Sequence, residues 1–159
     1  MQDRDANAVP ARLRIARRAI SNPSVLGEAY SGPKPLAYSR GMRVDFEGMA
    51  LLFISGTYSA DDQGRIVHAG DLRRQTRRIF EVITSLLSSE ACTWKDVVRT
   101  TCYLRDIDRD YEAFNEVRTA FYCEQGLDPL PASTGIQAKM FSPEVLVEIE
   151  AIAIIRTTN

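Results

Sequence analysis

The sequence predicts a single α+β domain with five strands and two helices in the order β-β-α-β-α-β-β. Its 159 residues match the size of one ordinary domain. Two long segments carry apolar residues at helical spacing, and shorter segments rich in aliphatic, β-branched and aromatic residues flank and separate them. With this order each helix crosses over one face of a single sheet.

Residues 1–36 form an N-terminal arm of irregular composition, and residues 37–159 form the main domain. Arginines alternate with apolar residues over positions 12–20, which fits either a short edge strand or a basic amphipathic turn. Asp3 and Asp5 argue against a transit peptide. The prolines and glycines that follow interrupt regular structure.

The first two strands of the main domain form a predicted hairpin. Residues 43–46 are the first strand, Glu47 and Gly48 the turn, and residues 49–55 the second strand. The second strand reads Met-Ala-Leu-Leu-Phe-Ile-Ser, a nearly continuous apolar run. Such a run predicts a central strand that is buried on both faces.

The first helix is predicted to begin after Asp71 and to end near Ser89. The Asp71 carboxylate can accept hydrogen bonds from the free N–H groups of the first turn. The apolar residues of this helix repeat at helical spacing: Leu72, Ile79, Val82, Ile83, Leu86 and Leu87. Thr93 is expected to cap a short turn that carries a buried Trp94.

The next strand and the second helix follow directly. Residues 97–104 are rich in β-branched and aromatic residues, which favours a strand. Residues 106–108 form a turn with a capping aspartate, and residues 109–125 a helix, which Gly126 terminates as a C′ cap. The apolar face of this helix is predicted to contain Tyr111, Phe114, Val117, Phe121 and Tyr122.

Residues 133–139 and 145–155 are the last two predicted strands. Both helices cover one face of the sheet, yet residues 49–54 show no alternation with polar side chains. The other face therefore needs a cover as well. In a chain of this size, association with further copies of the same chain is the simplest cover.

Composition narrows the class of function. The net charge of −1 gives no general attraction to nucleic acid. No apolar run approaches the roughly 20 residues that span a bilayer, and no signal-peptide core is visible, so we expect a cytoplasmic protein without membrane contact.

Cys92, Cys102 and Cys123 are too scattered for a disulfide framework and are expected to be buried free thiols. With His68 as the single histidine, we expect no metal and no other cofactor.

Five stretches of the chain, in order, resemble the Rid superfamily, also called the YjgF family. They cover most of residues 36–155: AYSRG at 37–41, FISGT at 53–57, Gln75, YEAFNEV at 111–117, and PA at 131–132 followed by VEIEAIA at 147–153. The resemblance implies a chorismate-mutase-like fold of the bacillus type and a homotrimer. Its sheets would form a central barrel with three clefts between subunits, where active members hydrolyse enamines and imines such as 2-aminoacrylate to keto acids and ammonia.

The resemblance also implies roles for individual residues. Glu148, in the closing strand, would act as a general acid–base or orient water, although Glu148 and Glu150 could also be a solvent-facing pair. The backbone of Gly56 and Thr57 would help to bind the ligand. Tyr38 would stack on a planar ligand, or it could have a structural packing role. Asn115 would contact the backbone near the site, and a purely structural role is equally open for it.

The sequence departs from the family at one residue that matters for substrate binding. Ser133 stands where the family has an arginine that binds the substrate carboxylate, and Gly135 stands where a cysteine is frequent. A serine cannot form the bidentate contact of a guanidinium. The hydroxyl and backbone groups of Ser133, Thr134 and Gly135 are candidate replacements. Lys139 is a further candidate, because it is predicted to lie on the same strand face as Ser133. Three arginines could also replace the missing cation, although each could equally be a solvated surface charge: Arg40, Arg43 and Arg99.

A weaker resemblance links residues 54–59, His68, Gln75 and the Pro-Ala-Ser-Thr-Gly segment to the Rid-like half of chorismatases, which remove pyruvate from chorismate. Three hypotheses follow. The protein hydrolyses an imine, enamine or related carboxylated metabolite; it binds a metabolite or regulates a partner without catalysis; or it acts on a cyclic or aromatic acid. Descriptions of some family members as ribonucleases find little support in the neutral charge of this chain.

Overall fold

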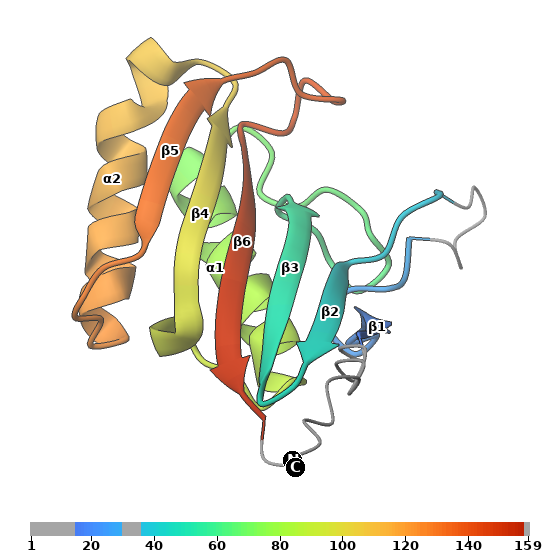
Figure 1. Cartoon of the computed structure of the whole chain (residues 1–159). Coiled ribbons are helices and arrows are strands. Elements are labelled where there is room, and N and C mark those ends of the chain that lie inside the picture. Colours follow the sequence, from blue (N-terminus) through green and yellow to red (C-terminus); the bar gives the residue numbers. More distant parts are fainter. Residues whose placement is uncertain (1–14, 30–35, 158–159) are drawn as a thin grey trace, which may run out of the picture.

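Six strands form one mixed sheet, and both helices pack on the same face of it in the computed structural model, which describes residues 15–29 and 36–157 (Figure 1). The strand order across the sheet is β1-β2-β3-β6-β4-β5. All neighbours are antiparallel except β4 and β5, which are parallel. The elements are β1 (Ala16–Ile20), β2 (Gly41–Phe46), β3 (Met49–Thr57), α1 (Leu72–Ser88), η1 (Trp94–Asp96), β4 (Val97–Leu104), α2 (Ile107–Glu124), β5 (Ala132–Gln137) and β6 (Val147–Arg156). The predicted α+β class is confirmed: the five predicted strands and two helices occur in the predicted order, and β1 adds a sixth strand.

Both helices begin and end within two residues of their predicted bounds. Asp71 accepts a hydrogen bond from the Arg74 amide at the start of α1, and Asp106 accepts one from the Arg109 amide at the start of α2. These carboxylates satisfy N–H groups that have no partner within the helix. Gly126 follows α2 with φ +61°, the left-handed conformation that favours glycine.

The N-terminal arm contributes an edge strand, one of the two alternatives for residues 12–20. β1 pairs with β2, and Arg18 binds Glu90 through two hydrogen bonds of 2.7 and 2.5 Å. Glu90 also accepts a hydrogen bond from Arg43 of β2 at 3.1 Å. The Glu90 side chain is only 3% exposed, so these contacts offset the cost of burying its charge. Residues 1–14, which hold Asp3, Asp5 and part of this arm, lie outside the described residues.

The hydrophobic core fills the space between the sheet and the helices. Phe80 of α1 stacks on Phe121 of α2 with ring centroids 4.6 Å apart, and Trp94 meets both rings edge-on. Trp94 is 1% exposed and its indole N–H donates to Thr84 Oγ1 at 2.7 Å. The prediction of a buried Trp94 is confirmed, and its polar atom has the partner that burial requires.

The opposite face of the sheet is open in the single chain. Along β3 the side chains alternate, so that Leu52 and Ile54 are buried while Phe53 is 42% exposed. In one chain the helices bury only one face of this strand. Burial of its other face, which was expected to come from further copies of the chain, stays a prediction. We call this surface the open face and the covered surface the helix face.

Three further expectations are corrected. β5 ends at Gln137, two residues before Lys139, because its partner β4 ends at Leu104. Cys123 is exposed on α2, whereas Cys92 and Cys102 are buried free thiols as predicted. Tyr111 is 48% exposed and does not belong to the buried face of α2.

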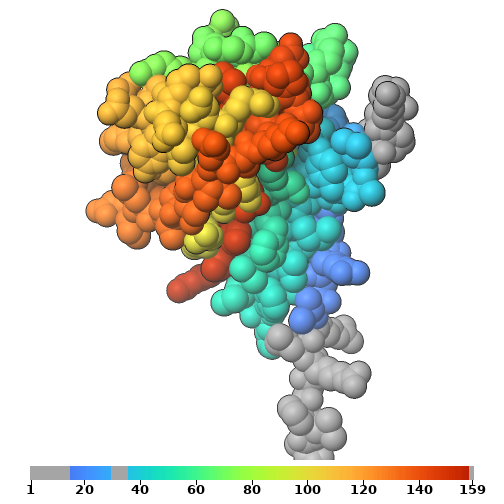
Figure 2. Space-filling view, turned by 90° about the horizontal axis from the view of Figure 1, so that it is seen from above, coloured from blue at the N-terminus to red at the C-terminus, as the bar shows by residue number. Residues whose placement is uncertain are grey.

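Several loops gather at one end of the molecule. Figure 2 shows the segment before α1 (green), the start of α2 (yellow-orange) and the segment after β5 (red-orange) side by side at this end. β6 also begins at this end, as Figure 1 shows, so Glu148 lies one residue inside the strand from these loops. Among the described residues, no helix is long and apolar enough to cross a membrane.

Candidate functional site

A hollow of about 530 Å³ on the open face brings together three of the predicted site residues. Glu148, Gly56 and Tyr38 line it, and Glu150 lies beside Glu148 on the same strand. Its remaining walls come from the ends of neighbouring loops and strands: Leu36, Ser55, Tyr58 and Phe141. Tyr58 and Phe141 meet edge-on, with ring centroids 4.9 Å apart, and close one side of the hollow. Sequence reasoning did not identify these two aromatic residues.

Glu148 lies directly against the backbone of Gly56. A β-carbon added to Gly56 would lie 2.0 Å from Glu148 Oε1, so only glycine leaves room for the carboxylate in this position. The pairing of β3 with β6 is irregular between Ile54 and Thr57, where three residue steps on β3 face two on β6. This bulge brings Gly56 beneath the Glu148 side chain.

The surroundings of Glu148 favour its protonated form. Partial burial raises the pKa of the Glu148 carboxyl above its ordinary value, and the negative charge of Glu150 raises it further. Burial also raises the pKa of the Tyr58 hydroxyl at the wall of the hollow. A carboxyl group with a raised pKa keeps its proton to higher pH than usual, which makes it a better candidate for proton exchange with a ligand.

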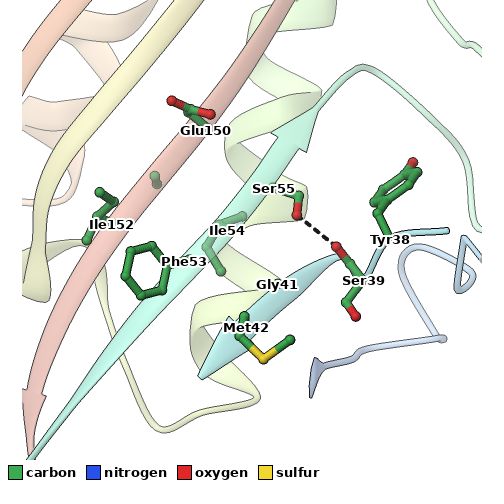
Figure 3. A pocket seen from close by; sticks show the side chains of 10 residues that line it. Tyr38, Ser39, Gly41, Met42, Phe53, Ile54, Ser55, Glu150 and Ile152 are labelled. Carbon is green, nitrogen blue, oxygen red and sulfur yellow. Dashed lines mark hydrogen bonds between the residues drawn. The ribbon is translucent and has the colours of Figure 1, made fainter. Parts of the chain in front are cut away.

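A second hollow, of about 360 Å³, adjoins the first along the open face (Figure 3). Its floor is mainly apolar, with Met42, Phe53 and Ile152 pointing into it. Tyr38 and Glu150 line both hollows. The two hollows therefore lie side by side along β2, β3 and β6.

Tyr38 is held in place by Arg40. Arg40 Nη1 donates to the Tyr38 hydroxyl at 2.8 Å, and its guanidinium carbon lies 5.4 Å from the Tyr38 ring centroid. Arg40 is 7% exposed and also donates to the Gly27 carbonyl at 3.0 Å. Tyr38 itself is 39% exposed, so its ring remains available to a ligand.

Three other predicted residues lie on the helix face, beside α2. Ser133 Oγ accepts hydrogen bonds from Thr100 Oγ1 at 3.1 Å and from Arg118 Nη1 at 3.0 Å. Arg118 Nη2 donates to Asn115 Oδ1. A β-carbon at Gly135 would lie 3.7 Å from the Tyr111 ring, which is ordinary contact. Ser133, Gly135 and Asn115 thus belong to a second group.

Three more predicted residues lie apart from both groups. Thr134 alternates with Ser133 and faces the open side, where its hydroxyl accepts a hydrogen bond from exposed Arg99 at 2.9 Å. The Thr57 side chain points into the core and donates to the Ser55 carbonyl at 2.9 Å, which leaves its backbone for a ligand. Lys139 is exposed in the segment after β5, so the reasoning that placed it on the Ser133 strand face is wrong.

The cation beside Ser133 is Arg118, which the sequence reasoning missed. Arg118 follows Asn115 by three residues, so both lie on one face of α2. This three-residue spacing is the feature of the sequence that could have identified Arg118 as a neighbour of Asn115. Of the other candidates, Arg43 is bound to Asp45 and Glu90.

His68 and Gln75 fasten the loop that leads into α1. His68 Nδ1 lies 3.2 Å from Ser59 Oγ, and His68 has a φ of +60°. The Gln75 side chain, fully buried, donates to the His68 and Glu144 carbonyls and accepts from the Leu146 amide at 2.9 Å. These residues, which carried the resemblance to chorismatases, thus have a structural explanation. Within residues 15–29 and 36–157, no group of three His, Cys, Asp or Glu side chains could hold a metal ion.

Comparisons with known proteins agree with this fold. The family model described as endoribonuclease L-PSP matches residues 33–155. A protein named 3-aminoacrylate deaminase RutC, from Acinetobacter baylyi, is 33% identical over 122 residues, which is 76% of this chain and 90% of the relative. A RutC family protein from Pyrococcus abyssi is 31% identical over 122 residues, covering 76% and 89% of the two chains.

Solved structures show the same architecture. The YjgF gene product of E. coli superposes with a TM-score of 0.68 at 25% identity, over 86% of this chain and 98% of that one. E. coli TdcF with bound serine superposes with a TM-score of 0.69 at 25% identity, over 87% and 98%. With a family model that spans most of its length and relatives above 30% identity, the chain belongs to the endoribonuclease L-PSP family, also known as the YjgF or Rid family.

Proposed function

We propose that this protein hydrolyses the imine or enamine of a small carboxylated metabolite, in clefts between the subunits of a homotrimer. The observation that carries the proposal is the Glu148 carboxyl, seated against the Gly56 backbone inside a hollow, with its pKa raised by burial and by Glu150. A carboxyl group in this state suits general acid–base catalysis.

The chemistry needs only water and one proton-transfer group. An enamine takes a proton from solvent on carbon, or an imine takes one on nitrogen, and either becomes an iminium ion. Ionised Glu148 then accepts a proton from water as the oxygen bonds to the iminium carbon, forming a carbinolamine. The Glu148 carboxyl gives that proton to the nitrogen, the carbon–nitrogen bond breaks to release ammonia, and the hydroxyl proton passes back to the Glu148 carboxylate as the carbonyl product forms. Gly56 lines the same hollow as Glu148, so its backbone would lie beside the bound substrate.

The arrangement of the two groups supports a site between subunits. Glu148 lies on the open face and Ser133 on the helix face, so one chain cannot present both to a single small ligand. A neighbouring copy can complete the site if its α2–β5 edge meets the open face of the first chain. Repeated head-to-tail, such a contact closes into a ring of three when successive copies are related by one third of a turn.

The open face has the composition of a surface that is covered by protein. Large apolar side chains are at least 41% exposed there: Met49, Phe53, Ile136 and Ile154. Exposed apolar patches of this kind mark interaction sites. Covering them would also bury the other face of β3, which the sequence predicted to be buried on both faces.

The relatives favour a small substrate that carries an amino or imino group and a carboxylate. One is named 3-aminoacrylate deaminase, and one solved structure contains serine. A hollow of about 530 Å³ suits such a ligand better than a polymer.

The proposal is tested by following ammonia release from 2-aminoacrylate, 2-iminobutyrate and 3-aminoacrylate, each generated in the assay. Wild-type protein should accelerate at least one reaction over buffer. Glu148→Gln should lower kcat/KM by about 100-fold or more, the usual contribution of a general acid–base. Glu47→Gln is the matched control, because Glu47 is exposed in the β2–β3 turn. No acceleration at high protein concentration, or equal rates for wild type and Glu148→Gln, would favour a metabolite-binding protein without catalysis.

A further inference from the structure

Arg118 is held in a fixed position by neutral groups. Nη1 donates to Ser133 Oγ at 3.0 Å, Nη2 donates to Asn115 Oδ1, and the guanidinium carbon lies 5.1 Å from the Phe114 ring centroid. Arg118 is partly buried between α2 and β5. Because these contacts orient the guanidinium in advance, a ligand that binds it loses little additional conformational entropy.

Across residues 15–29 and 36–157, no carboxylate forms an ion pair with Arg118. Four other arginines of the two helices pair with carboxylates: Arg73 with Glu116, Arg77 with Glu124, Arg78 with Glu81, and Arg109 with Asp110. A guanidinium has five N–H donors, and Ser133 and Asn115 take two of them. Arg118 therefore combines a partly desolvated charge with donors that remain for an anion.

The groups around Arg118 do not supply a negative charge. Burial raises the pKa of the Cys102 thiol, which lies 4.0 Å from Ser133 Oγ, so the thiol stays protonated. Burial likewise raises the pKa of the Tyr122 hydroxyl, which stays neutral. Thr100 contributes a hydroxyl, whose hydrogen bond to Ser133 is 3.1 Å long. None of these three neighbours offsets the positive charge of Arg118.

We infer that Arg118 binds the carboxylate of the substrate. Helix α2 thereby supplies the cation of the anion site, in place of the arginine that the family has at the position of Ser133. A planar guanidinium matches a carboxylate with two parallel hydrogen bonds. The ligand is thus a small organic carboxylate, bound in preference to its neutral amide. This inference rests on the proposed function for the identity of the substrate, while anion binding itself can be measured without turnover.

The test measures binding of 2-oxobutyrate, the stable product of 2-iminobutyrate hydrolysis, and of its neutral amide by NMR titration. Wild-type protein should bind the acid and not the amide. Arg118→Gln should raise the Kd for the acid by at least about 30-fold, which corresponds to about 2 kcal/mol. The Kd of Arg118→Lys for the acid should lie between those of the wild type and Arg118→Gln, because an ammonium keeps the positive charge but cannot form two parallel hydrogen bonds with a carboxylate. Arg73→Gln, which removes an exposed arginine of α1, should bind like wild type.

A second variant tests charge without removing the arginine. Asn115→Asp places a carboxylate of nearly the same shape where Asn115 Oδ1 already accepts from Arg118. It should weaken binding of 2-oxobutyrate as strongly as Arg118→Gln, while the thermal melting temperature stays equal or rises. A structural role for Arg118 alone would not produce that combination.

The outcomes separate the two proposals. Wild-type affinity in both Arg118→Gln and Asn115→Asp, or equal binding of acid and amide by wild type, overturns the anion site. Unchanged kcat/KM in Arg118→Gln, with deaminase activity present, also overturns it and leaves the proposed reaction standing. Loss of acid binding in both variants, with no turnover by any protein, supports the anion site and rejects the proposed reaction.

Discussion

The Glu148 carboxylate and the Gly56 backbone occupy adjoining positions, with Oε1 only 2.0 Å from the place that a β-carbon of residue 56 would take. The irregular pairing of β3 with β6 creates this approach. The contact makes residue 56 a determinant of where the carboxylate points, although its own side chain is a hydrogen atom.

Gly56→Ala should therefore impair function more than stability. The added methyl meets the end of a flexible side chain, so Glu148 moves aside at little cost, and kcat/KM falls by about 100-fold from misplacement of the carboxylate. Gly27→Ala is the contrasting variant, because its methyl would lie 2.8 Å from the Asp62 backbone oxygen, which cannot move freely. It should lose about 1–3 kcal/mol of stability. Urea denaturation and steady-state kinetics on both variants check this; a large stability loss in Gly56→Ala would contradict it.

Glu150→Gln should shift the acid limb of the pH profile. The charge of Glu150 helps to raise the pKa of Glu148, so its removal lowers that pKa. Since Glu148 must be ionised to accept a proton from water, activity in the variant should persist to lower pH. The pH dependence of kcat/KM measures the shift; an acid limb that moves to higher pH, or stays in place, would count against Glu148 as the base.

Glu148 should also make stability depend on pH. A carboxyl whose folded pKa is raised binds more protons in the folded than in the unfolded state, so its contribution to stability falls as pH rises from its ordinary pKa toward the raised value. Glu148→Gln removes this term. The variant should gain melting temperature relative to wild type as pH increases through that window. A difference between the two proteins that is constant with pH would refute the raised pKa.

Mixed trimers should recover activity from two inactive variants. Glu148→Gln and Arg118→Gln each spoil a different side of the proposed subunit boundary. After co-refolding in equal amounts, about one quarter of the clefts receive Glu148 from one copy and Arg118 from its neighbour. Activity near that fraction of wild type is expected at low substrate concentration. No recovery in mixed trimers, confirmed as mixed by mass spectrometry, would place the site within one chain.

Gln75→Leu should destabilise the fold strongly. The buried Gln75 amide bonds the His68 and Glu144 carbonyls and the Leu146 amide, and leucine leaves all three without these partners. We expect a loss of about 3 kcal/mol in free energy of unfolding, measured in urea. Gln63→Leu is the control, because Gln63 is exposed in a turn and its substitution should change little.

The parts of the fold that depend on local chemistry were predictable from the sequence. Asp71 and Asp106 cap helices because a helix end needs acceptors within its first turn, wherever the helix lies. Gly126 ends α2 because its φ of +61° is strained for other residues. Such signals act over a few residues, so they survive without knowledge of the tertiary structure.

The site was predictable only in part, because it depends on whether each side chain lies on the open face or the helix face of the sheet. Alternation along one strand cannot reveal the bulge between Ile54 and Thr57 that brings Gly56 under Glu148. It also could not show that β5 stops before Lys139, since the limit is set by the length of β4. Arg118 was overlooked because an arginine on a helix surface is usually solvated.

Glu148 and Arg118 lie on opposite faces of the sheet, so the proposed reaction would separate proton transfer from substrate recognition. Proton transfer would use β3 and β6, whereas selection of the charged substrate would use α2 and the edge strand β5. Substitutions that retune the preferred ligand can thus accumulate at one sheet edge while the reacting carboxyl keeps its surroundings. Exchange of an arginine between strand and helix is a change of this kind, and it offers a route for diversification of specificity on an unaltered chemical centre.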